Sequence, residues 1–306
     1  MITMKTVAIV NPAAGGGHAV RSWERIIRAL PSETRDLVTW YTKGSAHTAM
    51  LAGQARRQGF ERVIAAGGDG TLYHILNGLW WESGGELPSL GMVPLGTGCD
   101  YVRNFRPNRH LVEDLLGAMR NPPVNVGVGM AALQGLDGNP VQRVFLNILG
   151  TGYDASVAAR LGRSNKPKIG KISYLVGLLM ELVQLKAYRF QGEIDGNAFQ
   201  AESIMLVAGL GCCFGGGMRI APNASPLAAR FQVLWSQGVG RLRLLSLLAG
   251  VYRGRHLEHP SVRHCFARHL KIEASPPAYV EAEGELVGQT PIELGLHPGA
   301  LPFVTR

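Results

Sequence analysis

The chain has 306 residues, of which 46% are hydrophobic and 17% are charged, and its formal net charge is +9. This length predicts about two domains, and the apolar fraction excludes a disordered chain. No apolar run reaches the roughly 18 residues that a membrane-spanning helix needs, and the first residues resemble a strand and a turn rather than a signal peptide. The four cysteines lack the spacing of a zinc site or of a disulfide framework, so a cytoplasmic chain with reduced thiols is expected.

The first third of the sequence repeats one pattern three times: an apolar run, a glycine-rich loop and a segment with helical spacing. The apolar runs are Thr6–Val10, Arg62–Ala66 and Leu90–Leu95. The helical segments begin near Val20, Leu72 and Tyr101. Strand, loop and helix in this order predict a doubly wound α/β domain with a parallel sheet, whose loops meet at the carboxyl edge where ligands bind.

From about Pro122 the pattern changes to short alternating runs, which predict strands of a mainly antiparallel β domain. Asp195-Gly196 is a strong hairpin signal between two of them. Helices are expected over Ile172–Leu185 and Leu242–Tyr252. We therefore expect domains at 1–124 and 125–306, and leave open that the last strands return to the first domain. The predicted strands are Arg143–Ile148, Tyr188–Ile194, Ser203–Ala208, Phe231–Trp235, Leu270–Glu273, Ala278–Ala282 and Ile292–Leu296.

Glycine-rich loops that open helices can bind phosphate, because bare backbone N–H groups and the helix dipole favour an anion there. The most informative loop is Gly67-Gly68-Asp69-Gly70-Thr71. It matches neither the P-loop nor the dinucleotide-binding glycine pattern. Its Asp69 suits a magnesium–nucleotide, either holding the metal or accepting a proton, and the structural alternative is an Asx residue that stabilises the turn. Thr71 and Thr97 are candidate donors to phosphate oxygens.

Several motifs together resemble the catalytic domain of the diacylglycerol kinase family, which includes YegS-like lipid kinases, sphingosine kinases and ceramide kinases. Loop 67–71 is similar to the family's GGDGT signature, and Pro94 to Arg103 is similar to its PxGTxNDxAR block. Further matches follow in the right order along the chain. They are Asn11-Pro12, the set Asn147, Gly150, Gly152, Asp154 and Ala155, then Gly215-Gly216-Gly217 with Ala221-Pro222 and Ala224, and finally Glu283-Gly284-Glu285.

The resemblance implies an ATP- and magnesium-dependent lipid kinase with an NAD kinase/phosphofructokinase-like first domain and a lipid held against the second. It gives Glu285 the role of proton acceptor, with Asp69 and Asp100 assisting. The implied nucleotide contacts are Asn11, Thr42, Gly67, Gly68, Asp69, Gly70, Thr71 and Thr97. A catalytically silent relative that binds nucleotide or lipid is the alternative, and NAD kinase is disfavoured by the order of the motifs.

The sequence also departs from the family pattern. Cys99 stands in place of Asn, Glu283 in place of the Asp of DGE, and His74 in place of Glu. Ala228 and Ala229 replace an Asp-Gly pair that forms a second-domain magnesium site in the family, and Asn223 and Gln232 replace neighbouring acids. We therefore expect no magnesium site in the second domain and expect catalytic magnesium to bind through ATP and Asp69.

Basic residues concentrate between Arg160 and Lys171 and again between Arg241 and Lys271. A solvated basic face and an anionic membrane surface remain alternatives, while no motif for nucleic acid is present. The partners expected are thus a lipid substrate and a transient membrane surface, with a cytoplasmic protein peripheral to the inner face of the membrane. A homodimer is left open. His256 is interpreted as structural, and Cys212-Cys213 as buried core.

Overall fold

The computed structural model describes residues 4–34, 37–83, 86–105, 110–153, 155–156, 187–237, 247 and 250–305. It divides into two compact units, one of residues 1–126 with 299–306 and the other of residues 127–298. The predicted helix over Ile172–Leu185 lies outside the described residues, as do Asp154, the basic stretch Arg160–Lys171 and most of Leu242–Tyr252. Among the described residues no helix is long and apolar enough to cross a membrane.

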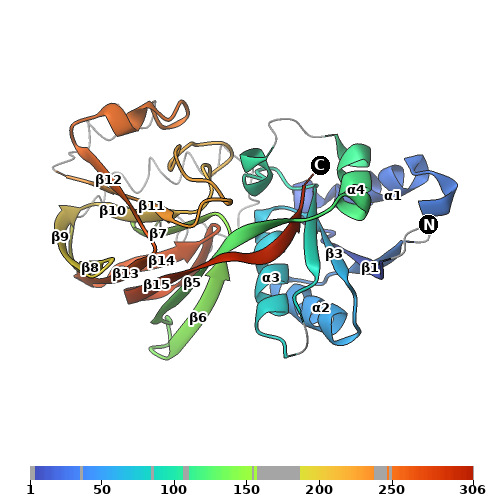
Figure 1. The fold of residues 1–306 in the computed structure, drawn as a ribbon, viewed down its shortest axis with the longest axis horizontal. Coiled ribbons are helices and arrows are strands. Elements are labelled where there is room, and N and C mark those ends of the chain that lie inside the picture. The colour runs from blue at the N-terminus through green and yellow to red at the C-terminus, as the bar shows by residue number, and fades with distance from the viewer. Residues whose placement is uncertain are drawn as a thin grey trace. The chain divides into compact units, whose positions relative to one another are not determined.

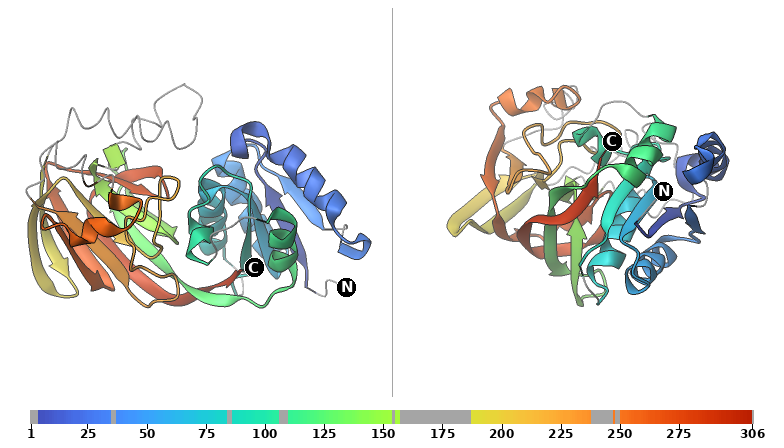
Figure 2. Two further views of the ribbon diagram at one scale, coloured as in Figure 1. Left: turned by 90° about the horizontal axis from the view of Figure 1, so that it is seen from above. Right: turned by 45° about the vertical axis from the view of Figure 1, so that its right-hand side comes forward.

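The first unit is built on a parallel sheet in the order β2-β1-β3-β4, to which the end of β15 adds a fifth strand beside β4. Helices cover both faces of this sheet (Figures 1 and 2). The doubly wound α/β architecture is therefore confirmed. Its elements are β1 (Thr6–Val10), α1 (Ala19–Ala29), β2 (Val38–Tyr41), α2 (Ser45–Arg57), β3 (Arg62–Gly67), α3 (Asp69–Trp80), β4 (Ser89–Pro94) and α4 (Leu111–Arg120).

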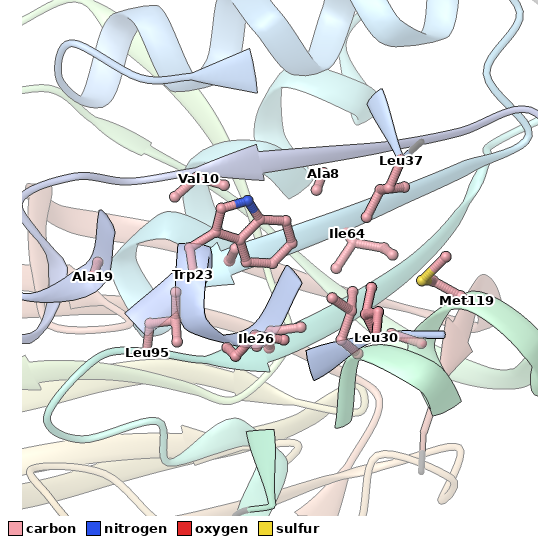
Figure 3. Close-up of a cluster of buried hydrophobic side chains, with 14 residues drawn as sticks. Ala8, Val10, Ala19, Trp23, Ile26, Leu30, Leu37, Ile64, Leu95 and Met119 are labelled. Carbon is pink, nitrogen blue, oxygen red and sulfur yellow. The ribbon is translucent and has the colours of Figure 1, made fainter. Parts of the chain in front are cut away.

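One apolar cluster of this unit forms where α1 and α4 pack on the sheet (Figure 3). Trp23 of α1 is almost fully buried and lies with Val10 and Ile64 of the sheet in one apolar cluster, which Leu115 of α4 completes. Each residue of β1 is buried, as expected for a parallel strand that has helices on both sides. The predicted third helix is shorter than expected, since Tyr101–Asn104 forms only a 3₁₀ turn.

Arg62 of β3 is buried beneath the end of α4, where its guanidinium replaces missing backbone donors. Its Nη1 donates to the Ala118 carbonyl at 3.2 Å and its Nη2 to the Asn121 carbonyl at 3.1 Å, while Nε bonds Ser89 Oγ at 3.0 Å. The helix cannot satisfy the Ala118 carbonyl itself, because residue 122 is a proline without an N–H. Burial lowers the pKa of Arg62, but three acceptors hold its charge at the negative end of the helix dipole.

Replacing Arg62 with Met should therefore destabilise the chain by about 3 kcal/mol, since one buried and one partly buried carbonyl lose their donor along with the charge–dipole interaction. Thermal unfolding of the full chain should shift down by roughly 5–10 °C. The matched control is Arg28→Met, because the Arg28 side chain is largely exposed on α1 and its contacts with Glu24 lie at the surface. Equal melting temperatures for the two variants would contradict the capping role of Arg62.

The second unit is mainly antiparallel, as predicted. Its central strands run in the order β12-β11-β10-β7-β14-β15, and β5-β6 and β13-β8-β9 join them through β15. The predicted hairpin is confirmed, since Ile194 pairs with Asn197 across Asp195-Gly196. The strands are β5 (Val124–Gln134), β6 (Pro140–Phe145), β7 (Ile148–Gly152), β8 (Tyr188–Ile194), β9 (Asn197–Ser203), β10 (Met205–Gly209), β11 (Phe231–Ser236), β12 (Val262–Ala267), β13 (His269–Ser275), β14 (Tyr279–Ala282) and β15 (Glu285–Val304).

Aromatic pairs join β11 to the strands that pack against it. Phe231 stacks on Phe145 of β6, and Trp235 meets Phe199 of β9 edge to face at 5.1 Å between ring centroids. Gly129 of β5 leaves room for the Phe145 ring, because a Cβ there would lie only 2.4 Å from it. These contacts bury one face of β11 inside a β-sandwich.

His256 anchors the short 3₁₀ helix Arg255–Glu258 to the segment that precedes β11. Its ring is buried, and Nε2 lies 2.9 Å from the Ile220 carbonyl. Burial is the main cause that lowers its pKa from the usual 6.5. The structural role predicted for His256 agrees with these contacts.

A lowered pKa means that the folded chain holds His256 neutral where the unfolded chain would protonate it. The corresponding stability is present above about pH 6.5 and is lost as the pH falls through the folded pKa. We expect His256→Gln to flatten the decline of melting temperature between pH 7 and pH 5. An unchanged slope in the variant would contradict this assignment. The exposed His18 of the first unit provides the control, as His18→Gln should leave the slope intact.

Candidate functional site

Three loops meet at the carboxyl edge of the parallel sheet, and the second and third are joined by backbone hydrogen bonds. The Gly67 carbonyl accepts the N–H groups of Leu95 at 2.9 Å and Gly96 at 3.0 Å. A Cβ on Gly96 would lie 2.4 Å from the Gly68 Cα, so the two loops can approach this closely only while residue 96 is glycine. The glycine pattern therefore reflects close packing of two loops as well as turn formation.

Asp69 and Asp100 approach each other at this edge, one from each loop. A Cβ built on Gly98 would lie 3.2 Å from Asp69 Oδ2 and 3.6 Å from Asp100 Oδ2, so both carboxylates flank one small space. Asp69 is half-buried, and its Oδ1 accepts the Tyr101 N–H at 3.1 Å. Two carboxylates around one space are the oxygen ligands that a hard divalent cation prefers.

Arg103 keeps Asp100 in place; it ends the sequence motif of residues 94–103 but was not predicted as a site residue. Its Nε lies 3.0 Å from Asp100 Oδ1, although Asp100 itself is only 4% exposed. The signal was present, because an acid and an arginine three positions apart on one helical turn can form an ion pair. Arg103 also approaches the Gly98 carbonyl, so that it spans the third loop.

Asn11 links the first loop to the second. Its Nδ2 donates to Thr71 Oγ1 at 2.9 Å, while its Oδ1 accepts the Ala13 N–H at 3.1 Å. Thr71 is 4% exposed, so its hydroxyl lies beneath the loop. Thr97, in contrast, is exposed at the surface. The predicted nucleotide contacts of these three residues remain predictions.

Thr42 lies at the same edge, directly after β2. Its N–H donates to the Val10 carbonyl at 2.9 Å. Its Oγ1 is buried and has no hydrogen-bond partner within the described part of the chain. Buried hydroxyl groups are normally paired in folded proteins, so the Thr42 hydroxyl is available to a ligand at this edge, and its predicted nucleotide contact stays a prediction.

Helix α3 begins at Asp69, and Gly68 is its N-cap. The first hydrogen bonds to the Gly68 carbonyl come from Thr71 and Leu72. The N–H groups of Asp69 and Gly70 therefore precede the helical ladder and are available to an anion. Oxygen ligands and backbone donors thus lie side by side at the edge, as a magnesium–nucleotide requires.

Cys99, which departs from the family pattern, retains polar contacts at its position. Its φ is 50°, in the left-handed region that Asn adopts more readily than Cys. The fully buried thiol lies 3.4 Å from the Gly96 carbonyl and 3.6 Å from that of Gly67. The Cys99 side chain therefore bridges the two loops. His74 is the other residue in this unit that differs from the family pattern, and its ring lies edge-on to that of Tyr73 within α3.

Glu285, the predicted proton acceptor, lies in the second unit directly after the β14–β15 turn. The turn residues Glu283 and Gly284 have φ values of 56° and 82°, and Ala282 pairs with Glu285 across them. Glu281 Oε2 accepts the Gly284 N–H at 2.6 Å. This hydrogen bond fixes the turn from inside the same hairpin.

Glu283 anchors the turn to the segment between β6 and β7. Its Oε1 accepts the N–H groups of Leu146 at 2.9 Å and Asn147 at 2.6 Å. The sequence predicted one strand over Arg143–Ile148. The structure has two, because Leu146 and Asn147 donate their N–H groups to the Glu283 side chain. Of the three acids in this segment, Glu281 and Glu283 hold the hairpin, whereas the described residues offer the half-buried Glu285 carboxylate no hydrogen bond or ion pair.

The positions that lost their acids have structural roles in the second unit. Gln232 is fully buried in β11, and its Oε1 accepts the Asn223 N–H at 2.9 Å. The N–H of Ala228 donates to the Ser225 carbonyl, and the Ala229 carbonyl accepts Arg268 Nε. The amide of Gln232 suits its position in β11. The absence of a second-domain magnesium site stays a prediction.

Comparisons with known proteins agree on one family. Residues 5–131 match the model of the diacylglycerol kinase catalytic domain, and residues 147–305 match that of the YegS C-terminal NAD kinase beta sandwich-like domain. A diacylglycerol kinase of Mycobacterium tuberculosis is 30% identical over 302 residues, which cover 97% of this chain and 94% of the relative. A diacylglycerol kinase of Staphylococcus aureus is 25% identical over 283 residues, covering 92% and 86%.

Solved structures share the fold. A Bacillus anthracis protein described as a candidate diacylglycerol kinase superposes with a TM-score of 0.80 at 23% identity, over 99% of this chain and 95% of that chain. Yeast NADH kinase superposes with a TM-score of 0.54 at 12% identity, over 99% and 84%. From the family models and the full-length relatives, the chain belongs to the diacylglycerol kinase family and is a kinase, for which ATP is the implied phosphoryl donor.

Proposed function

We propose that the chain is a magnesium-dependent lipid kinase that transfers the γ-phosphoryl group of ATP to a lipid hydroxyl. The observation that carries the proposal is the approach of Asp69 and Asp100 to one space at Gly98, beside the N-terminus of α3. The names of the full-length relatives support diacylglycerol or a similar alcohol as the acceptor.

The residues divide the task by their chemistry. Asp69 and Asp100 offer oxygen ligands, and magnesium bound with ATP would neutralise charge on the phosphoryl group being transferred. The N–H groups at the start of α3 and the Thr42 hydroxyl would bind phosphate and nucleotide oxygens. A lipid alcohol is a poor nucleophile, so a carboxylate must accept its proton, and Glu285 is suited to this because its carboxylate is not engaged in holding the hairpin.

The alternative is a silent relative that binds ATP or lipid without transfer. Two observations favour the active enzyme: Cys99 keeps a polar bridge between the loops, and Glu283 keeps the turn before Glu285. A transfer assay with radiolabelled ATP distinguishes the two. The acceptors are diacylglycerol, monoacylglycerol, sphingoid bases and phosphatidylglycerol, each in mixed micelles with magnesium. Label in one lipid supports the kinase, whereas ATP binding without label in any of them supports the silent relative.

We further propose that the second unit contacts an anionic membrane surface while it works on its lipid. Arg253 and Arg255 are exposed beside the exposed Tyr252, whereas Arg241 and Arg243 lie outside the described residues. On the edge strand β12, Phe266 is exposed and carries Arg230 over its ring at 4.0 Å. Exposed aromatic and basic side chains together are typical of a surface that meets anionic headgroups.

The Arg253→Gln/Arg255→Gln double variant should bind anionic vesicles more weakly than the parent chain. At roughly 1 kcal/mol for each arginine, the partition coefficient should fall about 30-fold at low salt, with nucleotide affinity unchanged. Co-sedimentation with phosphatidylserine and phosphatidylcholine vesicles measures it. The control is Arg21→Gln/Arg25→Gln, which removes two exposed charges from α1. Equal binding to both kinds of vesicle would mean that the basic residues form only a solvated face.

A further inference from the structure

Cys212 and Cys213 form a pair of neighbouring thiols directly after β10. Their sulfur atoms are 2.8 Å apart, closer than two thiols normally pack. Cys213 is buried, but Cys212 is partly exposed to solvent, so the pair differs from the fully buried Cys99. The sequence interpretation as buried core therefore holds for Cys213 and is wrong for Cys212.

We propose that Cys212 and Cys213 are a reversible redox site that reacts with a low-molecular-weight disulfide. The Cys212 thiolate attacks one sulfur of the small disulfide, forms a mixed disulfide and releases one small thiol. The Cys213 thiol then loses its proton and attacks the Cys212 sulfur, which expels the second small thiol. Two protein thiols are oxidised to one disulfide, and one small disulfide is reduced to two thiols.

The bond formed in this way is easily reduced again, which is what a switch requires. The two Cα atoms are joined through one peptide and are about 3.8 Å apart in the trans form, whereas ordinary disulfides span roughly 4.4–6.8 Å. Ring closure must therefore distort the peptide between the two residues. Strained disulfides of this kind have higher reduction potentials and open when the thiol pool recovers.

The pair is connected by hydrogen bonds to the turn that precedes Glu285. The Cys213 carbonyl accepts Asn147 Nδ2 at 2.6 Å, and the Cys212 carbonyl accepts the Ala221 N–H at 3.2 Å. The Asn147 N–H in turn donates to Glu283 Oε1 at 2.6 Å. Rotation of the peptide on ring closure turns the Cys212 carbonyl away from Ala221 and displaces that of Cys213.

Oxidation should consequently loosen Asn147 and, through it, the Glu283 turn. Asn147 is 2% exposed and also accepts the N–H groups of Leu210 and Gly211 on its carbonyl. All contacts of this network belong to the second unit. Their response can therefore be measured without substrate, nucleotide or catalysis, so the result does not depend on the function proposed above.

The test equilibrates the full chain with glutathione disulfide, alkylates remaining thiols and maps the peptides by mass spectrometry. We expect the peptide with both cysteines to escape alkylation and to be lighter by two hydrogen atoms, and dithiothreitol to reverse the change. Hydrogen exchange of the peptides that contain Leu146, Asn147 and Gly284 should become about tenfold faster, as expected when one hydrogen bond is lost.

Cys212→Ser and Cys213→Ala variants remove the ring, and Cys265→Ser is the matched control that keeps the pair. Glutathione disulfide should leave exchange unchanged in the first two and accelerate it in the control. A variant of the pair is taken as correctly folded when its hydrogen exchange in the reduced state equals that of the parent chain. The proposal is overturned if the pair is alkylated or carries only glutathione after treatment, or if the internal disulfide forms and exchange at the Glu283 turn stays the same.

Discussion

Asp69→Asn should slow phosphoryl transfer by at least about 10²- to 10³-fold, or ~3–4 kcal/mol in the barrier, while the chain keeps its fold. The carboxylate faces Asp100 across Gly98 at the start of α3, so its negative charge is available to a cation there. The amide of Asn removes that charge but keeps an oxygen that can accept the Tyr101 N–H. Steady-state kinetics with the lipid identified in the acceptor assay, together with thermal unfolding, measures both parts of the prediction.

The matched control for this variant is Glu113→Gln, which neutralises an exposed acid in the first turn of α4. Both substitutions remove one negative charge from a helix N-terminus in the same unit, so their effects on the helix dipole are similar. Only Asp69 lies in the space shared with Asp100. Normal turnover in a folded Asp69→Asn chain would refute the assignment, as would an equal loss in both variants.

The strands of the first unit were predictable because buried parallel strands are continuous apolar runs that end at glycine loops. The predictions for β1, β3 and β4 agree with the structure to within one residue at each end. β2 was not predicted: its four residues favour strands, but two of them are exposed and no glycine cluster like those after β1, β3 and β4 follows it. An edge strand has fewer apolar neighbours and leaves a weaker pattern.

The long strand β15 shows why the second unit was harder to predict. Only Ile292–Leu296 was predicted, because three prolines and several glycines interrupt the 20 residues of Glu285–Val304. The strand persists because its partners change along its length: β14 near Gly288, β13 near Ile292, and β4 at Phe303. Pairing over such sequence separations depends on tertiary contacts, which local pattern does not encode.

The candidate site was predictable where chemistry follows from topology. Asp69 and Asp100 follow adjacent parallel strands, so the shared edge of the sheet brings them together. The partner of Thr71 was not predictable, because the hydrogen bond from Asn11 spans 60 positions. The family resemblance already singled out Glu285, but it did not predict that Glu281 and Glu283 hold the hairpin, which only their contacts show.

The second large effect is expected at Glu285, whose carboxylate does not hold the hairpin. Glu285→Gln should lower the turnover number by about 10²- to 10⁴-fold, since an amide cannot accept the proton of the lipid hydroxyl. ATP affinity and melting temperature should stay the same, because the carboxylate holds neither the hairpin nor, within the described residues, another side chain. Equilibrium binding of ATP, thermal unfolding and steady-state kinetics on one preparation measure the three quantities.

Two further variants distinguish proton transfer from a structural effect. Glu283→Gln keeps an oxygen for the Leu146 and Asn147 N–H groups, so any loss of turnover there should be accompanied by a lower melting temperature. Glu293→Gln removes an exposed acid further along β15, whose ion pair with Lys271 contributes little at the surface, and should behave as the parent chain. If the turnover of Glu285→Gln falls only as far as that of Glu293→Gln, Glu285 is not the proton acceptor. If its turnover falls at every pH while stability and ATP binding hold, the acid that the hairpin leaves unengaged is the one that takes the proton.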